Sequence, residues 1–435
     1  MYFVDDSASF VEAPVYFCAT TNVQGCHQHE LDDDTDSITS EASSRYTMST
    51  ISSNEVACMS SIRDSYYQTR IHPNPPILIT TSDITSSTSS IPPPACRYEW
   101  LTSCNITLAG FFRTLYGSTY VADENVPLTF PTDSVAERLD ILCNTMIQLC
   151  QGGANVPTEA HELLEKGGLD GMGARVLDLA TNSGVWCVPS RFHGTLEPAM
   201  YAFTPRVQEM ARTYPNAKFL SLDVKPLAAL APHPRIELEV YDVYAGITAP
   251  DASFDLVHVR NCVALTKDFN FLLREMHRVL KPGGILLIGE MPLQAFEVSD
   301  PSVELYPSSS QAAAFSFMRD VYISQGVDVA AWDDLHTRLD PKHPTWANKG
   351  GFHMIASPTY LLPNGIWHPE ERQRAIGALA SFLFEKVWRA LTPMLQIMGM
   401  EKAGAEAFVN DVEEEWRDSR YNYYVKYKVW CARKI

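Results

Sequence analysis

The chain has 435 residues, of which 46% are hydrophobic, 11% aromatic and 20% charged, a composition typical of a globular protein with a sizeable core. Its 34 Lys and Arg against 52 Asp and Glu give a net charge of -18, so we expect no direct nucleic-acid partner and no membrane partner. Scattered cysteines, an acidic start and no apolar run near ~20 residues predict reduced thiols and a cytoplasmic or nuclear location.

The first part of the chain is poor in large apolar residues. Residues 33–95 are dominated by Ser and Thr and cannot offset the entropy of ordering, so we predict that residues 1–95 form a disordered tail. Cys26, His27 and His29 stand beside a run of aspartates, but no second ligand pair follows at a structural-zinc spacing. We therefore expect no metal site there.

Helical periodicity precedes the first strand. Apolar residues recur at helical spacing over residues 97–115 and again over 133–151, where Thr132 or Asp133 is the expected N-cap. We predict that residues 96–170 form a helical lid at the start of a domain that covers the rest of the chain, residues 96–435.

Short apolar strands then alternate with helices, which predicts an α/β fold with a parallel, doubly wound sheet. The expected strands are 175–179, 218–222, 236–241, 254–259 and 285–289, and the expected helices are 207–214 and 269–280. Residues 171–290 are the expected cofactor-binding core.

The last part, residues 291–435, is predicted to contribute the acceptor pocket and the C-terminal elements. A helix that begins at Pro369 carries an apolar stripe ending near Pro393. A second helix over 404–417 and an alternating strand over 423–431 follow.

Ligands of such sheets bind beyond the carboxyl ends of the strands. After the first strand, the small residues of 178–184 allow backbone N–H groups and a helix N-terminus to approach a ligand. Asp223 ends the second strand, where an acidic residue accepts hydrogen bonds from ribose hydroxyls. After the third strand, Asp242 is placed to accept from an adenine amino group and Val243 to pack on the ring. These positions form a candidate nucleotide site.

The fourth strand places His258, Arg260 and Asn261 at the mouth of the same crevice. One of them would face the methionine end of a cofactor or the substrate. A histidine that only completes the hydrogen bonding of a strand end is the alternative.

Taken together, these residues resemble the class I S-adenosylmethionine-dependent methyltransferases. Residues 176–184 match motif I, Asp223 matches the acidic second motif, and 272–284 look like the helix and turn before the fifth strand. The resemblance implies a Rossmann-like seven-stranded methyltransferase sheet with an antiparallel last strand, and S-adenosyl-L-methionine as cofactor. The cofactor-binding residues that we expect are Asp178, Ala180, Thr181, Asn182, Gly184, Asp223, Asp242, Val243, Arg260 and Asn261.

Within the class, the chain is similar to the fungal LaeA-like methyltransferases through residues 128–133, 137–139 and 423–434. Members are linked to regulation of secondary metabolism or to methylation of small metabolites. The resemblance implies methyl transfer to a small secondary metabolite or to a regulatory protein target, and it does not identify the acceptor.

The chain departs from the family at motif I. Ala180 and Asn182 replace two of its three usual glycines, and asparagine tolerates positive φ better than most residues. Residues 187–206 then lengthen the connection to the helix at 207–214, with three prolines and no helical or strand period. We favour an unspliced intron over a real insertion for this segment.

No catalytic base is obligatory for methyl transfer, because positioning and exclusion of water supply most of the rate. If the acceptor is a hydroxyl, the histidines expected nearest the crevice are His258, His336, His343 and His353. Aromatic residues expected either in the acceptor pocket or in the core are Trp332, Trp346, Phe352 and Tyr360.

Two other functions were weighed. A nicotinamide-dependent dehydrogenase requires G-x-G-x-x-G after the first strand, where residues 180–185 read Ala-Thr-Asn-Ser-Gly-Val. The stronger rival is a catalytically impaired methyltransferase fold that serves as a regulatory protein-binding module. The reduced motif I favours that rival, and loss of cofactor binding would support it.

Overall fold

The computed structural model describes residues 110–128, 130–154, 156–180, 206–225, 234–305, 309–347, 350–417 and 421–435. Several predictions from the sequence therefore lie outside the described residues. They are the tail at 1–95 with its metal candidates, the motif I residues Thr181, Asn182 and Gly184, and all but the last residue of the segment at 187–206.

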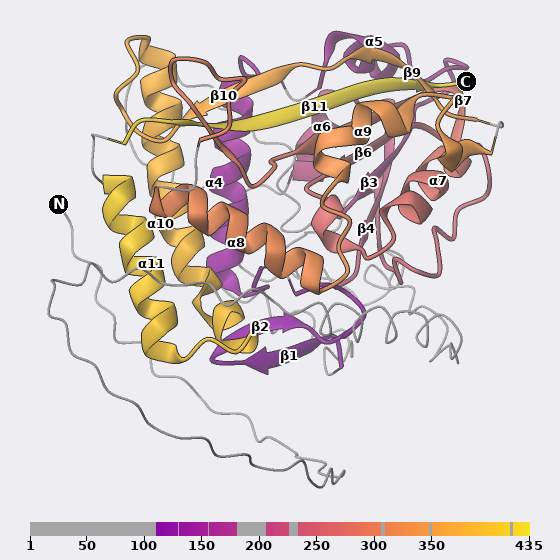
Figure 1. The fold of residues 1–435 in the computed structure, drawn as a ribbon. Coiled ribbons are helices and arrows are strands. Elements are labelled where there is room, and N and C mark those ends of the chain that lie inside the picture. Colours follow the sequence, from indigo (N-terminus) through magenta and orange to yellow (C-terminus); the bar gives the residue numbers. More distant parts are fainter. Residues whose placement is uncertain are drawn as a thin grey trace, which may run out of the picture. The chain divides into compact units, whose positions relative to one another are not determined.

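The centre of the fold is a β-sheet flanked by helices, as the predicted α/β class requires (Figure 1). Its main strands are β3 (Arg175–Leu179), β4 (Lys218–Asp223), β5 (Ile236–Val240), β6 (Phe254–Arg260), β7 (Leu280–Glu290), β10 (Thr359–Pro363) and β11 (Tyr424–Lys434). They lie in the order β10-β11-β7-β6-β3-β4-β5, with β3 to β7 parallel and β11 antiparallel to both of its neighbours. The α/β fold class and the antiparallel last strand are confirmed.

Two short strands widen this sheet beyond the seven expected. β8 (Ala295–Phe296) and β9 (Phe352–Ala356) both pair with β11, which makes nine strands in all. The seven strands of the prediction remain its continuous path.

The parallel strands are buried on both faces, as their apolar sequences require. Val176, Leu177 and Leu179 of β3 are at most 1% exposed, and all seven residues of β6 are buried. Register places Asp178 beside His258, so the carboxyl ends of β3 and β6 meet at one edge. The residues that follow the strands therefore gather along this edge.

Helices cover the sheet, and a group of further helices that includes α10 (Glu371–Ile397) and α11 (Lys402–Arg417) lies to one side of it (Figure 1). The others are α4 (Ser134–Cys150), α5 (Thr158–Glu165), α6 (Arg206–Thr213), α7 (Phe269–Val279), α8 (Ser310–Ser324) and α9 (Ala331–Leu339), with the 3-10 turns η1 (Val263–Leu265) and η2 (Pro344–Trp346). α10 packs against α4 and α11, and α11 against α8. Asp133 caps α4 by accepting from the N–H groups of Val135 and Ala136, so it is the N-cap of the predicted pair.

The predicted helix over 97–115 is wrong at its described end. Phe112–Leu115 is strand β1, which pairs with β2 (Ser118–Val121) in an antiparallel hairpin. Tyr116 and Gly117 both have positive φ, 49° and 84°, the backbone that a tight two-residue hairpin turn requires. This turn overrides the helical spacing, and the described part of the predicted lid, from residue 110 on, is therefore part hairpin and part helix.

The end predicted for α10 near Pro393 is also wrong, because the helix continues to Ile397. An internal proline costs about 3 kcal/mol through its missing N–H and its clash with the preceding turn. Trp388, Leu391 and Met394 are at most 5% exposed, and each such side chain stabilises the fold by about 1.5–3 kcal/mol. Burial of this stripe offsets the proline.

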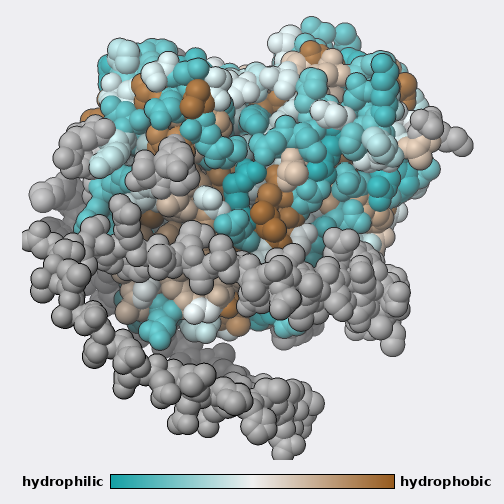
Figure 2. All heavy atoms as spheres, viewed as in Figure 1, coloured by the Kyte–Doolittle hydropathy of each residue, from teal (hydrophilic) through white to brown (hydrophobic). Residues whose placement is uncertain are grey.

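The outer surface is mainly polar. Figure 2 shows a largely hydrophilic face with smaller apolar groups, one of them near its centre. None of the helices in the described ranges is long and apolar enough to cross a membrane.

Candidate functional site

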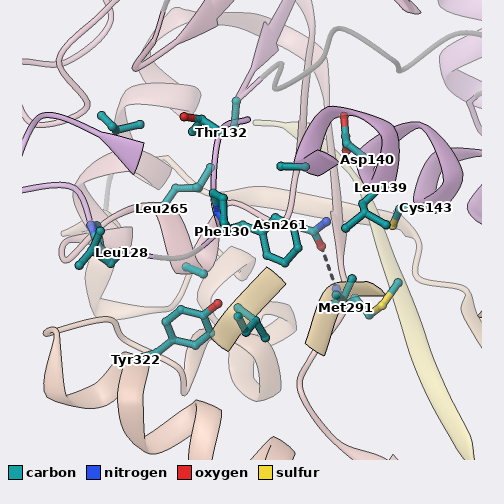
Figure 3. Close-up of a pocket in the computed structure, with 18 of the residues that line it drawn as sticks. Leu128, Phe130, Thr132, Leu139, Asp140, Cys143, Asn261, Leu265, Met291 and Tyr322 are labelled. Carbon is teal, nitrogen blue, oxygen red and sulfur yellow. Dashed lines mark hydrogen bonds between the residues drawn. The ribbon is translucent and has the colours of Figure 1, made fainter. Parts of the chain in front are cut away.

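A cavity of about 320 Å³ lies at the carboxyl ends of the parallel strands (Figure 3). Its strand-end wall is formed by Ala180 after β3, Asp223 at the end of β4, Asn261 after β6 and Glu290 at the end of β7. Residues from the lid and from three helices close the opposite side. The crevice expected from the strand order is therefore a cavity with a defined wall.

The predicted cofactor residues divide into three groups. Ala180, Asp223, Val243 and Asn261 line the cavity. The second group lies near the carboxyl ends of the strands but does not line the cavity, and consists of Asp178, Asp242 and Arg260. The third group, Thr181, Asn182 and Gly184, lies outside the described residues.

The backbone is left-handed at two points of this wall, with φ of 53° at Ala180 and 48° at Asn261. Asparagine tolerates this conformation, whereas alanine rarely adopts it, so the strain is at Ala180. Met291 N–H donates to Asn261 Oδ1 at 3.2 Å, which ties this turn to the end of β7 (Figure 3). Strained residues of this kind cluster at binding sites, where the surrounding structure holds them in place.

Asp223 presents a buried carboxylate to the cavity, with a residue exposure of 3%. Lys225 lies beside it, with Nζ 3.7 Å from Asp223 Oδ1, and also lines the wall. Val243, 2% exposed, adds an apolar surface at the end of β5. A carboxylate next to an apolar wall matches a ribose and an adenine ring.

Asp178 and His258 form a buried pair, with 2.7 Å between Oδ1 and Nδ1. They are register partners on β3 and β6, so this hydrogen bond joins the strands beneath the cavity edge. This arrangement matches the structural alternative for His258 rather than contact with a ligand in the cavity.

Arg260 and Asn144 form a second buried polar group, between β6 and α4. Arg260 Nη1 donates to Asn144 Oδ1 at 2.7 Å, and the two residues are 7% and 0% exposed. Arg260 Nε and Asn144 Nδ2 are buried donors without a hydrogen-bond acceptor. Unpaired buried polar groups are costly in a folded protein, so these two donors mark a position where the fold is not optimised for stability alone.

Glu290 is the functional candidate that the sequence analysis missed. Its Oε1 accepts from the N–H groups of Cys262 and Val263 at 2.7 and 3.3 Å, and its Oε2 accepts from Trp332 Nε1 at 2.9 Å. Burial raises the pKa of its carboxyl to about 7, although these N–H groups oppose the shift. The signal in the sequence was an acidic residue directly after the apolar run of the fifth strand.

The rest of the cavity is an apolar chamber between α8, α9 and α10. Its walls are formed by Phe315, Met318, Tyr322, Trp332, Leu383, Phe384, Val387, Trp388 and Leu391. Of the four aromatic residues proposed for the acceptor pocket, only Trp332 lines it. Trp346 and Phe352 pack on His277 instead, and Tyr360 packs on Tyr427. None of the four predicted histidines is among the lining residues.

A lid segment covers the chamber. Residues of the LaeA-like signature line its inner side, among them Leu128, Phe130 and Thr132 (Figure 3). The Gln325 side chain holds the Leu128 backbone at two points, accepting from N–H at 2.6 Å and donating to the carbonyl at 3.0 Å. The lid is thus attached to α8 by a side-chain amide.

Comparison with known proteins identifies the class. Residues 207–288 match the family model of the methyltransferase domain. Together with the strand order and the strand-end cavity, this match shows a class I methyltransferase domain, whose cofactor is S-adenosylmethionine. The matched residues begin after the lengthened segment at 187–206, so the match does not include the motif I loop.

Within that class the chain is similar to fungal LaeA-like methyltransferases. It is 22% identical over 346 residues to methyltransferase pytC of Aspergillus terreus, covering 78% of this chain and 88% of that protein. It is also 22% identical over 293 residues to the secondary metabolism regulator laeA of Coprinopsis cinerea, covering 65% and 64%. A solved phosphoethanolamine N-methyltransferase 2 of Haemonchus contortus, in complex with S-adenosyl-L-methionine, has a TM-score of 0.33 at 13% identity over 72% of this chain and 61% of that chain.

Proposed function

We propose that the strand-end wall of the cavity binds S-adenosylmethionine and that the apolar chamber holds a small-molecule methyl acceptor. One observation carries the proposal. Ala180, Asp223, Val243 and Asn261, each expected at a cofactor, share a single cavity with the chamber. Donor and acceptor would therefore meet without crossing solvent.

The residues present fit the cofactor. Asp223 would accept from the ribose hydroxyls, and Val243 would pack on the adenine, with Asp242 accepting from its amino group. Arg260, which pairs with Asn144 behind the lining residues, remains a proposed contributor at the methionine end. Asp178, and the loop with Thr181, Asn182 and Gly184, remain proposed contributors next to the methionine end.

When bound, S-adenosylmethionine supplies an activated methyl group on a sulfonium. The protein's contribution is to orient the acceptor and to exclude water, which the lid segment and the apolar walls of α8 and α10 are placed to do. A cytoplasmic or nuclear location, where this cofactor is available, remains part of the proposal.

A second function is a regulatory protein-binding module in which cofactor binding is weak or lost. The strained Ala180 at the position of the first motif I glycine favours it. The similarity to a protein named a secondary metabolism regulator supports the same function. In that case a regulatory protein, rather than a small molecule, would be the partner or the methyl acceptor.

Calorimetric titration of S-adenosylhomocysteine into the full chain separates these functions. We expect micromolar binding that Asp223→Asn weakens about 10- to 100-fold, since a hydrogen bond to a charged group contributes about 1.5–3 kcal/mol. Asp251→Asn, which changes a carboxylate with a side-chain exposure of 78%, is the matched control and should bind like the unaltered chain. No binding by the folded, unaltered chain would contradict the enzyme function and favour the regulatory module.

A further inference from the structure

We propose that the methyl acceptor is an uncharged, largely apolar small molecule with a hydroxyl group, and that Glu290 accepts the hydrogen bond and then the proton of that hydroxyl. The inference rests on the proposed function, because it requires the cofactor to occupy the strand-end wall of the same cavity.

The position of Glu290 is the first argument. It ends β7 and lines the cavity together with Met291, which follows it, and Trp332, which contacts it from the chamber side. Three N–H donors and the Cys262 thiol contact its carboxylate, whose two oxygens together offer about four lone-pair sites. The thiol is the weakest of these donors, so a hydroxyl inside the cavity would take its place.

The chamber supplies the second argument. Its walls beyond Glu290 are mainly apolar side chains such as Phe315, Met318 and Leu391, and the polar groups among them, the Tyr322 hydroxyl and the Trp388 indole N–H, are uncharged. A charged group placed there would lose its hydration without compensation. The cavity of about 320 Å³ is at the small end of ligand pockets and includes the strand-end wall proposed for the cofactor. Its chamber therefore suits a small acceptor.

The charged groups of the cavity provide the third argument. Asp223 and Lys225 pair with each other at the strand-end wall, and Asp140 belongs to α4. Glu290 is in direct contact with the indole N–H of the chamber residue Trp332, at 2.9 Å. This contact places its carboxylate beside the chamber.

The surroundings of Glu290 leave it as the group that titrates near neutral pH. Cys262 faces it from the turn after β6, and burial raises the pKa of this thiol well above its usual value. Tyr322 packs on Trp332 from α8, and burial raises the pKa of its phenol. Lys428 is its register partner on β11, and burial lowers the pKa of this amine. A base with a pKa near the working pH is effective in proton transfer.

The transfer step is balanced. The acceptor oxygen forms a bond to the methyl carbon, the methyl–sulfur bond breaks and leaves a neutral thioether, and the hydroxyl proton moves to the Glu290 carboxylate. The cofactor's positive charge and the carboxylate's negative charge are both lost, so the chamber holds no net charge after transfer. Release of the proton to water restores Glu290.

The test uses 2-naphthol, naphthalene and the 2-naphthylmethylammonium ion as probes, titrated into the full chain saturated with S-adenosylhomocysteine. We expect 2-naphthol to bind about 10-fold tighter than naphthalene above pH 7, since a hydrogen bond to a charged group contributes at least about 1.5 kcal/mol. The advantage should shrink as Glu290 becomes protonated below pH 7, and it should lose its pH dependence in Glu290→Gln. Trp332→Phe removes one donor to the carboxylate and should move the midpoint of this dependence to higher pH.

Three results would overturn the inference. They are equal binding of 2-naphthol and naphthalene, tightest binding of the ammonium ion, and loss of the 2-naphthol advantage in Asp140→Asn but not in Glu290→Gln. If Glu290→Gln does not fold, the shift of the midpoint in Trp332→Phe decides instead. Failure of S-adenosylhomocysteine to bind the unaltered chain would be a failure of the proposed function and is measured before any probe is added.

Discussion

The two ends of the parallel strands differ in how their polar groups are satisfied. At the amino ends, Asp255 is fully buried and accepts from Leu169 N–H at 3.0 Å, Arg175 N–H at 2.9 Å and Lys281 Nζ at 2.9 Å. At the carboxyl ends, the backbone is left-handed at Ala180 and at Asn261 and strained at Ala180, and buried donors lack acceptors. One end therefore stabilises the sheet, and the other is arranged for a ligand.

The largest expected effect is a loss of stability when Asp255, at the amino ends of the strands, is replaced. Asp255→Ala should lower the free energy of unfolding by about 3–5 kcal/mol, since two N–H groups lose their acceptor, at about 1–3 kcal/mol each, and Lys281 loses one of its two carboxylate partners. Urea denaturation measures this loss. Asp170 is the matched control, because it also pairs with Lys281 but has an exposed side chain, and Asp170→Ala should cost far less. Equal losses would contradict the assigned role of Asp255.

The next effect is the pH dependence of stability that Glu290 causes at the carboxyl ends of the strands. The pKa of Glu290 is about 7 in the folded chain against 4.5 as its ordinary value, so the folded state holds its proton more tightly. Its contribution to stability is full below pH 4.5 and is lost as pH rises through 7, by on the order of 3 kcal/mol. Urea midpoints across this range should therefore fall more steeply for the unaltered chain than for Glu290→Gln.

His277 does not line the cavity and serves as a control, because its effect on stability changes with pH in the opposite direction. Burial lowers the pKa of His277 to about 4, so its contribution is present above 6.5 and is lost as pH falls toward 4. His277→Gln should thus remove acid sensitivity and leave the Glu290 slope intact. A Glu290→Gln curve parallel to that of the unaltered chain would mean that this carboxyl does not titrate near neutral pH.

The smallest expected effect tests the strain at the ligand end. Ala180→Gly should stabilise the chain by about 0.5–1 kcal/mol, because glycine adopts a left-handed backbone without steric cost. Ala252 has the same φ of 53° but lies outside the cavity, so Ala252→Gly should stabilise similarly. Only Ala180→Gly should also change the affinity for S-adenosylhomocysteine, and an unchanged affinity would argue against its place at the cofactor.

The same division explains what could be predicted from the sequence. The parallel strands follow from apolar runs that alternate with helices, and Asp223 and Val243 were found because their positions lie at or after strand ends. The hairpin β1–β2 was missed because the apolar residues of its first strand continue a pattern with helical spacing. The decisive information was the positive φ of Tyr116 and Gly117, which spacing does not reveal.

The chamber was harder to predict for a different reason. Helical periodicity shows which face of α10 is buried, but not whether Leu383 and Phe384 face other side chains or a cavity. α8 was missed because the buried stripe along it includes small and polar residues such as Gln311 and Ala314, which weaken the apolar pattern in the sequence. Glu290 was missed because the predicted strand ended one residue before it.

Hydrogen exchange with and without S-adenosylhomocysteine tests the difference between the two strand ends most directly. We predict that the ligand slows exchange in peptides covering residues 219–225 and 241–265, at the carboxyl ends, and leaves 166–175 and 280–284, at the amino ends, unchanged. Protection confined to the amino ends, or no protection in a folded chain exposed to saturating ligand, would contradict the assignment of the cavity as the cofactor site.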